Sequence, residues 1–229
     1  TGKAKSVCSL DFGDGMTWEI IGSAGEKIIL KVYQYPDNMT EKDVAALDEN
    51  NYLDLLKKSR IVYASLELST GEKTQVYSQP TEGNSYTEKI LDGCLYVSNE
   101  SSQDIIKIDL FTGEKSTLCS LESNYIYGTL GDYLCCTRYD STSDSGYSLV
   151  NVKDGDIKHC SLTNQSLGWQ LDLMAMAKDR ALVVYDYEYT PLGDDSYDIT
   201  RYQYGLISMD DLLNSVPNYT PIQMIGRGI

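Results

Sequence analysis

The chain has 229 residues, of which 41% are hydrophobic and 10% aromatic, a composition typical of a folded protein with a sizeable apolar core. Its 34 acidic and 19 basic side chains give a formal net charge of -15, which repels nucleic-acid phosphates and anionic membrane surfaces. No apolar run reaches the roughly 18 residues of a membrane span, and no charged and apolar leader opens the chain. We therefore expect no nucleic-acid partner and no transmembrane segment.

A tripeptide near the start of the chain occurs twice more along the sequence. The triplet Cys-Ser-Leu at Cys8 recurs at residues 119 and 160, and each copy follows a Thr-Gly or Asp-Gly pair. The turn glycines Gly71, Gly113 and Gly155 are 42 residues apart (113 minus 71, and 155 minus 113). Aliphatic residues stand three and five positions before each glycine, with a polar residue between them. This alternation predicts a strand with one buried face that ends in a tight hairpin.

Each repeat also holds a second tight hairpin further upstream. Four antiparallel strands in a repeat of this length are typical of a β-propeller blade, which buries both faces only when neighbouring blades stack on it. We predict an all-β fold of four-stranded antiparallel blades, with residues 1–229 as a single β-propeller domain or propeller fragment. The expected blades are residues 11–79, 80–121, 122–163 and 164–229. Residues 1–10 are expected to be the outer strand of a further blade, so the chain is either a fragment of a larger ring or one of two chains that close it.

One insertion, residues 37–59, is predicted to be helical near residues 40–58. Thr40 is the expected N-cap because Asp43 stands three residues later. Apolar residues then follow at helical spacing, at Val44, Leu47, Leu53 and Leu56. This helix is expected to act as a lid or docking element, or else to cover the edges of the blades.

The cysteines are predicted to be structural. One position of the repeat is shared by Cys8, Cys119, Cys160 and Tyr77, so the thiol is not required there. No Cys-x-x-Cys pair typical of a zinc site occurs, and Cys135 and Cys136 are expected on opposite faces of a strand. His159 is expected to point away from the neighbouring cysteine, which disfavours a catalytic pair. We expect buried, reduced thiols, with disulfides as the alternative, and no metal or cofactor.

The long connections of every blade are expected on one face of the disc, because the first and third turns of each meander are tight. Variable loops on a rigid scaffold commonly carry binding sites. Four aromatic residues enter the innermost strands on that face and are the predicted ligand-binding residues: Trp18, Tyr86, Tyr125 and Trp169. Their rings are suited to stacking on sugars or holding a peptide, and packing between the sheets is the alternative.

Two acidic stretches are expected to be solvated loops, with calcium binding as the alternative. The first carries Asp186, Glu188, Asp194, Asp195 and Asp198. The second, residues 140–146, departs from an EF-hand loop by placing Ser145 where the glycine should be.

Tyrosines alternate along the first of these stretches. Tyr185, Tyr187 and Tyr189, together with Tyr202 and Tyr204 on the expected partner strand, are predicted to form a ladder on one face of the sheet. Cross-strand packing accounts for such a ladder, and a sugar-binding platform is the alternative.

The stretch "DIIKIDLFTGEKSTL", with its I-x-x-I-D-x-x-T-G-E core, and the "L-x-G-x-L-Y" hairpins resemble the bacterial TolB-like and low-density-lipoprotein-receptor-like β-propeller domains of unknown function. The resemblance covers nearly the whole chain. It implies six to eight blades, binding rather than catalysis, and an extracellular or cell-envelope location, with lipid anchoring through a removed N-terminal segment. This chain has about four blades instead.

Three functions are compatible with these patterns. The first is a non-enzymatic binding or scaffolding propeller that recognises a protein, peptide or glycan through its long-loop face, with self-association through exposed blade edges as a further expectation. The second is a propeller-type glycoside hydrolase or lyase that uses carboxylates of that face, namely Asp14, Glu19, Glu88 or Asp172. The third is a structural module of a larger polypeptide. We predict the first, because no catalytic constellation is recognisable in the sequence.

Overall fold

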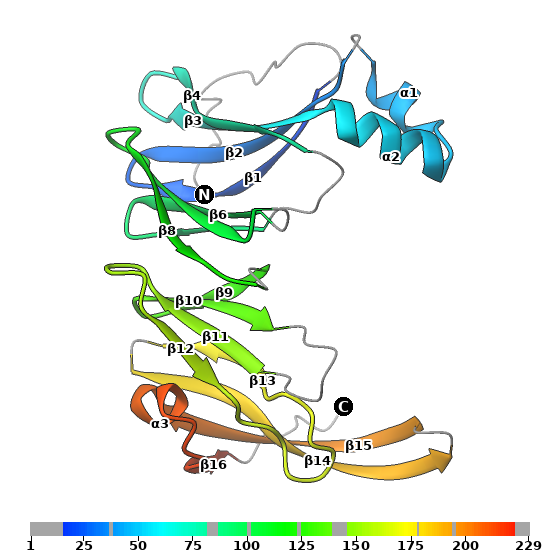
Figure 1. Ribbon diagram of the computed structural model, residues 1–229, viewed down its shortest axis with the longest axis vertical. Helices are drawn as coiled ribbons and strands as arrows, with labels where there is room; N and C mark the ends of the chain where they lie inside the picture. Colours follow the sequence, from blue (N-terminus) through cyan, green and yellow to red (C-terminus); the bar gives the residue numbers. More distant parts are fainter. Residues whose placement is uncertain are drawn as a thin grey trace, which may run out of the picture. The chain divides into compact units, whose positions relative to one another are not determined.

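The computed structural model describes residues 16–36, 39–81, 87–99, 102–122, 125–138, 146–177, 179–193 and 196–222 (Figure 1). The strand expected at residues 1–10 lies outside the described residues. The chain divides into two compact units, which we call unit 1 (Thr1–Glu122) and unit 2 (Ser123–Ile229). Each unit holds two four-stranded sheets.

Unit 1 contains two sheets whose strands pair in chain order. Sheet 1 consists of β1 (Met16–Ala24), β2 (Lys27–Gln34), β3 (Arg60–Glu67) and β4 (Lys73–Pro80). Sheet 2 consists of β5 (Glu88–Leu91), β6 (Cys94–Asn99), β7 (Asp104–Asp109) and β8 (Lys115–Ser120). All neighbouring strands are antiparallel, so each sheet is the simple meander of a propeller blade.

Unit 2 repeats this plan. Sheet 3 consists of β9 (Tyr125–Leu130), β10 (Tyr133–Arg138), β11 (Gly146–Asn151) and β12 (Ile157–Cys160). Sheet 4 consists of β13 (Asp172–Met176), β14 (Arg180–Gly193), β15 (Ser196–Ser208) and β16 (Tyr219–Ile222), with helix α3 (Met209–Leu213) before its last strand. The predicted all-β fold of four-stranded antiparallel blades is therefore confirmed.

Glycine sets the third turn of the first three sheets. Gly71, Gly113 and Gly155 have φ angles of 75°, 76° and 77°, a backbone region that side chains with a Cβ atom rarely adopt. The near-identical angles show that the 42-residue spacing marks one turn geometry, used three times. The repeat period read from the sequence is thus a repeat of backbone structure.

The predicted helical insertion lies between β2 and β3. It forms two short helices, α1 (Glu41–Ala45) and α2 (Glu49–Lys58). Thr40 caps α1 as expected, because its hydroxyl accepts from the Asp43 N–H while the Asp43 carboxylate accepts from the Thr40 N–H. Asp48 caps α2 by accepting from the Asn51 N–H at 2.9 Å.

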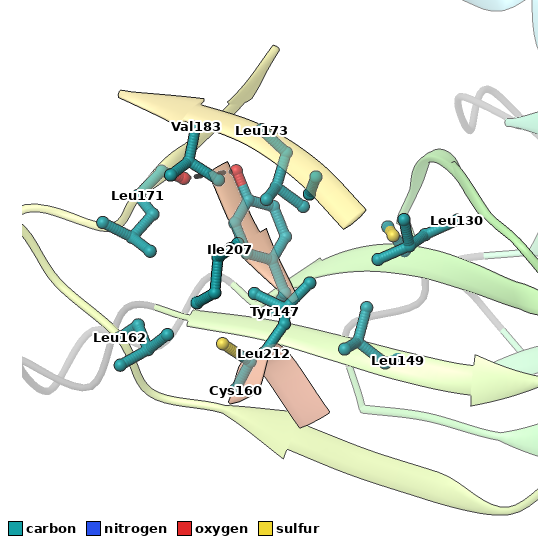
Figure 2. Packing of buried hydrophobic residues seen from close by; sticks show 12 residues of the cluster. Leu130, Tyr147, Leu149, Cys160, Leu162, Leu171, Leu173, Val183, Ile207 and Leu212 are labelled. Atoms are coloured by element: carbon teal, nitrogen blue, oxygen red, sulfur yellow. Dashed lines mark hydrogen bonds between the residues drawn. The ribbon is translucent and has the colours of Figure 1, made fainter. Parts of the chain in front are cut away.

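The core of each unit lies between its two sheets. In unit 1, buried aliphatic side chains of sheet 1 meet those of sheet 2, and the members include Ile29, Ile61, Tyr63, Leu95, Val97 and Ile108. In unit 2, Figure 2 shows the corresponding cluster, with Leu149 and Tyr147 of sheet 3 facing Leu173, Val183 and Ile207 of sheet 4. Stacking of one blade on the next therefore supplies the apolar burial that a single blade lacks.

A buried tyrosine ties the two sheets of each unit together. The Tyr63 hydroxyl of β3 donates to Glu88 Oε2 of β5 at 3.2 Å. The Tyr147 hydroxyl of β11 donates to the carbonyl oxygen of Leu171, next to β13, at 2.8 Å (Figure 2). Both tyrosines stand eight residues before their turn glycine (71 minus 63, and 155 minus 147). The intervening copy of this position is Ile105, which is fully buried and has no hydroxyl to donate.

Exchange of Gly146 for alanine is expected to destabilise unit 2 by about 2 kcal/mol. A Cβ atom at Gly146 would lie 2.5 Å from the backbone oxygen of Cys160, so β12 would have to move. Gly128→Ala is the matched control in the same sheet, because there the added methyl meets only the flexible end of Met176 at 3.0 Å. Urea unfolding, monitored by circular dichroism, measures the free energy of unfolding of both variants. Equal losses in the two would contradict the expectation.

The described cysteines agree with a structural role. All five are free thiols, four of them buried and Cys119 half-buried, whereas Cys8 lies outside the described residues. Burial raises the pKa of the Cys135 thiol to about 12 and that of Cys119 to about 11. A thiol with such a pKa is almost entirely protonated at neutral pH and is a poor nucleophile.

Candidate binding surface at the long connections

The two longest insertions occupy the same topological position. Helices α1 and α2 connect the second and third strands of sheet 1, and the outer half of the β14–β15 hairpin connects the second and third strands of sheet 4. In an antiparallel meander this connection lies at the end of the sheet where the first strand begins. We call this end the long-connection end of each sheet.

Three of the four predicted binding aromatics are described, and all three are substantially exposed. Trp18 near the start of β1 is 44% exposed, Tyr125 at the start of β9 is 40% exposed, and Trp169 just before β13 is 44% exposed. Tyr86 lies outside the described residues. Each of the three stands at the long-connection end of its own sheet, so large aromatic surface is available to a ligand there.

Trp169 belongs to an aromatic cluster on the β14–β15 hairpin. Its ring meets Tyr187 of β14 and Tyr197 of β15 edge-on, with centroid distances of 5.9 Å in both cases. The Tyr187 hydroxyl donates to Asp172 Oδ2 at 2.7 Å, which fixes this ring against the first strand of sheet 4. Tyr189 in turn contacts Tyr197 at 5.1 Å. We call Trp169, Tyr187, Tyr189 and Tyr197 the hairpin aromatic cluster.

The predicted tyrosine ladder is only partly right. Tyr187 and Tyr202 face each other across the strands as expected, with ring centroids 5.6 Å apart, and Tyr204 follows Tyr202 at 6.3 Å. Tyr185 is not in the ladder, because a bulge between Val184 and Asp186 redirects it. It stacks instead on Tyr219 of β16, with centroids 4.9 Å apart.

A groove of about 540 Å³ lies at the root of this hairpin. Its lining combines tyrosine rings, an ion pair and apolar side chains: Tyr185, Glu188, Arg201, Tyr202, Gln203, Tyr204, Pro221 and Ile222. Arg201 Nη1 lies 3.5 Å from Glu188 Oε1, and both side chains are more than half exposed. This groove was not predicted, because its residues come together only through the pairing of β14, β15 and β16.

Two of the four predicted carboxylates meet at a buried lysine in unit 1. Lys31 Nζ of β2 lies 2.9 Å from Glu88 Oε2 and 3.8 Å from Glu19 Oε1. The Lys31 side chain is 6% exposed and that of Glu88 is 12% exposed, whereas Glu19 is 56% exposed. Burial alone lowers the pKa of Lys31, but the attraction of Glu88 and its hydrogen bond outweigh that effect, so the pKa is raised.

This network makes Glu88 the acceptor of two fixed donors, the Lys31 ammonium and the Tyr63 hydroxyl. Burial and the nearby Glu88 charge raise the pKa of Tyr63, so its hydroxyl stays protonated and keeps donating. Asp172 stands 84 residues after Glu88 (172 minus 88), at the same repeat position, and it also accepts from a tyrosine. Carboxylates at this position therefore anchor phenols. Asp14 lies outside the described residues.

Two acidic residues of the hairpin stretch, Asp186 and Glu188, have partners in the structure. Asp186 accepts from the Ser166 N–H at 3.0 Å; burial raises its pKa, but hydrogen bonds from Ser166 outweigh this and lower it overall. Asp194, Asp195 and residues 140–145 lie outside the described residues. Within the described ranges, no group of three or more His, Cys, Asp or Glu side chains is placed to hold a metal ion.

Sequence reasoning missed two members of these sites. Lys31 sits in an alternating strand and reads as solvent-facing, yet it is buried against the next sheet. Tyr197 joins the aromatic cluster on a hairpin whose register shifts at Glu188/Tyr189 and at Pro191/Gly193. The burial of Lys31 had one signal in the sequence, which is the run of apolar residues on both sides of the lysine in "ILKVY".

Comparisons with known proteins give distant likenesses. No protein-family model matches the sequence, and no curated protein matches it. Three similar solved structures are an oligogalacturonate lyase in complex with manganese (14% identity, TM-score 0.45), TolB from Acinetobacter baumannii (9%, 0.44) and a puromycin hydrolase mutant complexed with PGG (9%, 0.44). They cover 89%, 92% and 93% of this chain, which spans 50%, 58% and 40% of their respective lengths. In the described part of this chain, no helix is long and apolar enough to cross a membrane.

Proposed function

We propose that the chain is a non-enzymatic binding or scaffolding module built from TolB-like propeller blades, whose sheets recognise a protein, peptide or glycan at their long-connection ends. The observation that carries this proposal is the exposure of Trp18, Tyr125 and Trp169, each 40–44% accessible at the start of a first strand. Exposed aromatic rings held on rigid sheets lose little conformational entropy on binding and offer flat apolar surface. We further propose a location on the bacterial surface or outside the cell, with lipid anchoring through a segment upstream of this sequence.

Replacement of the exposed aromatics is expected to weaken binding by about tenfold for each ring that contacts the ligand. Glycan and peptide arrays would first identify a ligand for the unaltered chain, and titrations of Trp18→Ala, Tyr125→Ala and Trp169→Ala would follow. The chain has two tryptophans, and both are predicted contact residues, so intrinsic fluorescence reports directly on ligand binding.

Phe111→Ala is the control for these variants. Phe111 is 62% exposed but lies in the tight turn between β7 and β8, away from the long-connection end of sheet 2. Its replacement should leave affinity unchanged. If Phe111→Ala weakened binding and none of the other three variants did, the long-connection ends of the sheets would not be the binding surfaces.

A propeller-type glycoside hydrolase or lyase is the second candidate. One observation favours it: Glu19 and Glu88 both approach the Lys31 ammonium, so two carboxylates share one location at the start of β1 and β5. Against it, Glu88 is already engaged by Lys31 and Tyr63. Turnover of a glycan by the unaltered chain, abolished by Glu19→Gln, would establish this candidate in place of the first.

A further inference from the structure

The first strands of the two sheets in unit 2 each carry a β-bulge. In β9 the pairing with β10 skips Tyr127, and in β13 the pairing with β14 skips Met174. Both bulge side chains are exposed, Tyr127 to 49% and Met174 to 56%. A bulge redirects the side chain that it carries, and bulges are frequent beside functional sites. These two positions therefore present large apolar side chains outward from the first strands.

A buried tyrosine connects these two strands. Tyr147 of β11 is 6% exposed, and its ring centroid lies 6.2 Å from that of Tyr127. Its hydroxyl donates to the carbonyl oxygen of Leu171 at 2.8 Å (Figure 2). Leu171 lies between Trp169 and Asp172 in the sequence. One side chain thus links the exposed ring of Tyr127 to the segment that carries Trp169 and Asp172. We call Tyr127, Trp169, Asp172 and Met174 the first-strand surface of unit 2.

The indole ring of Trp169 is held in place by contacts that are not parallel stacks. The ring is 44% exposed, and the rings of Tyr187 and Tyr197 meet it at interplanar angles of 61° and 74°. Neither tyrosine therefore lies parallel over the indole face. A ring that is already fixed loses little conformational freedom when a flat apolar face stacks on it.

An exposed carboxylate stands beside this ring. Asp172 Oδ2 accepts from the hydroxyl of Tyr187 at 2.7 Å, and the ring of Tyr187 contacts Trp169. This hydrogen bond fixes the orientation of the Asp172 carboxylate, whose side chain is exposed. Carboxylates accept strong, charge-assisted hydrogen bonds from hydroxyl groups. A fixed ring beside a fixed acceptor matches a pyranose sugar, which has an apolar C–H face and hydroxyl groups along its rim.

The charge of this surface is negative. Residues 125–130 and 169–176, which supply it, contain one carboxylate, Asp172, and no lysine or arginine. The whole chain has a net charge of -15. A uronate or sulfated glycan would be repelled, with no cation on these two segments to offset the repulsion. The glycan chemistry that fits this surface is therefore uncharged.

We propose that the first-strand surface of unit 2 binds an uncharged oligosaccharide of pyranose units. One sugar stacks on Trp169 and donates a hydroxyl hydrogen to Asp172, while another sugar of the same ligand contacts Tyr127 and Met174. Stacking supplies most of the affinity, and the carboxylate selects the orientation of the sugar. The proposal rests on the proposed binding function, and it narrows the ligand to an uncharged glycan and the site to unit 2.

The variant Trp18→Phe turns Trp169 into a direct reporter, because the chain has two tryptophans. Hexasaccharides of β-1,4-linked glucose, mannose and N-acetylglucosamine are the uncharged probes, and a hexamer of galacturonic acid is the charged comparison. We expect at least one uncharged probe to change the Trp169 fluorescence saturably and to bind about tenfold or more tightly than the charged hexamer. No binding of any uncharged probe, or equally tight binding of the charged hexamer, would overturn the proposal.

Substitutions in the otherwise unaltered chain, followed by titration calorimetry, test the assigned residues. Trp169→Ala and Tyr127→Ala should each weaken binding of the uncharged probe about tenfold. Asp172→Asn keeps an oxygen for the Tyr187 hydroxyl and should weaken binding about fivefold, because the acceptor loses its charge. Phe111→Ala removes a ring that is 62% exposed in unit 1 and should leave the affinity unaltered. Equal losses in Phe111→Ala and Trp169→Ala would rule out the assigned surface.

Two outcomes would separate this proposal from the proposed function. Glycan binding that falls in Trp18→Ala, but in neither Trp169→Ala nor Tyr127→Ala, would overturn the site in unit 2 alone. Binding of a peptide that is lost in Trp169→Ala, with no glycan bound, would overturn the glycan assignment and leave the proposed function standing. Binding of neither a glycan nor a peptide would overturn both.

Discussion

Exchange of Glu88 for glutamine is expected to lower the free energy of unfolding of unit 1 by about 3 kcal/mol. The variant keeps an oxygen for the Tyr63 hydroxyl but leaves the Lys31 ammonium, 6% exposed, without its closest counter-ion. A buried charge that loses its partner keeps the full desolvation penalty, and this penalty dominates the loss. Urea unfolding, monitored by circular dichroism and by the fluorescence of Trp18 in unit 1, measures the change.

Glu19→Gln is the control, because Glu19 is 56% exposed and 3.8 Å from the same ammonium. Its loss should stay below about 1 kcal/mol. A triple variant, Lys31→Met with Glu88→Leu and Tyr63→Phe, removes both charges and also the hydroxyl that would lose its acceptor, and it should recover most of the stability lost in Glu88→Gln. If Glu88→Gln cost no more than Glu19→Gln, the ion pair would not stabilise the stacking of sheets 1 and 2.

Above pH 10 the fold is expected to unfold cooperatively, because its buried phenols ionise far more easily in the unfolded chain. Burial, the largest cause in each case, raises the pKa of Tyr63, Tyr96, Tyr147 and Tyr187, and it raises that of Tyr219 to about 12. A raised pKa means that the folded state holds protons which the unfolded state has lost. Stability is therefore intact below pH 10 and falls as pH rises, by about 1.4 kcal/mol per pH unit for each fully buried group.

Lys31 acts in the same direction over the same range. Its pKa is raised above the ordinary 10.5, so the stability it contributes is present below that pH and is lost as pH rises through the raised value. We expect the tyrosinate absorbance of the buried phenols to appear in one step, together with the loss of the β-sheet signal. Ionisation of all nineteen tyrosines near pH 10 with the fold retained would contradict this expectation.

Phenylalanine substitutions separate the buried phenols from the exposed ones. Tyr63→Phe removes one ionising group from the core. The free energy of unfolding of this variant, measured from its own value at neutral pH, should therefore fall less steeply above pH 10 than that of the unaltered chain. Tyr202→Phe alters a side chain that is 47% exposed and should leave the pH dependence of the free energy of unfolding unchanged. The comparison reads the contribution of one buried hydroxyl directly.

Blade architecture could be predicted because its signals are local. Alternating apolar residues and a glycine at each tight turn fix a hairpin within about a dozen residues, and the repetition at 42 residues links the hairpins into sheets. The capping residues Thr40 and Asp43 predicted the start of α1 for the same reason. Packing of one blade on the next followed from the need to bury both faces.

The groove and the charged network could not be predicted, because they depend on register and on contacts between sheets. A single bulge before Asp186 sends Tyr185 to Tyr219 and breaks the expected ladder, and period-two patterns do not reveal bulges. Lys31 meets Glu88 across 57 residues of sequence, and neither residue is unusual in its own strand. The exposed aromatics at the starts of the first strands could be predicted in part. The sequence repeat predicted their positions, but their exposure could be known only from the structure.

The sheet-linking tyrosine occurs in sheets 1 and 3 but not in sheet 2, so its period is 84 residues (147 minus 63), twice that of the turn glycines. Loss or gain of one repeat would place a sheet with tyrosine at this position next to a sheet without the matching acceptor. A buried hydroxyl would then face an apolar neighbour, or an acceptor would go unsatisfied. Loss or gain of two repeats preserves every pairing. Chains of this architecture should therefore shrink or grow most readily by pairs of blades, and an engineered duplication of residues 16–122, which hold sheets 1 and 2, is expected to be better tolerated than a duplication of one blade.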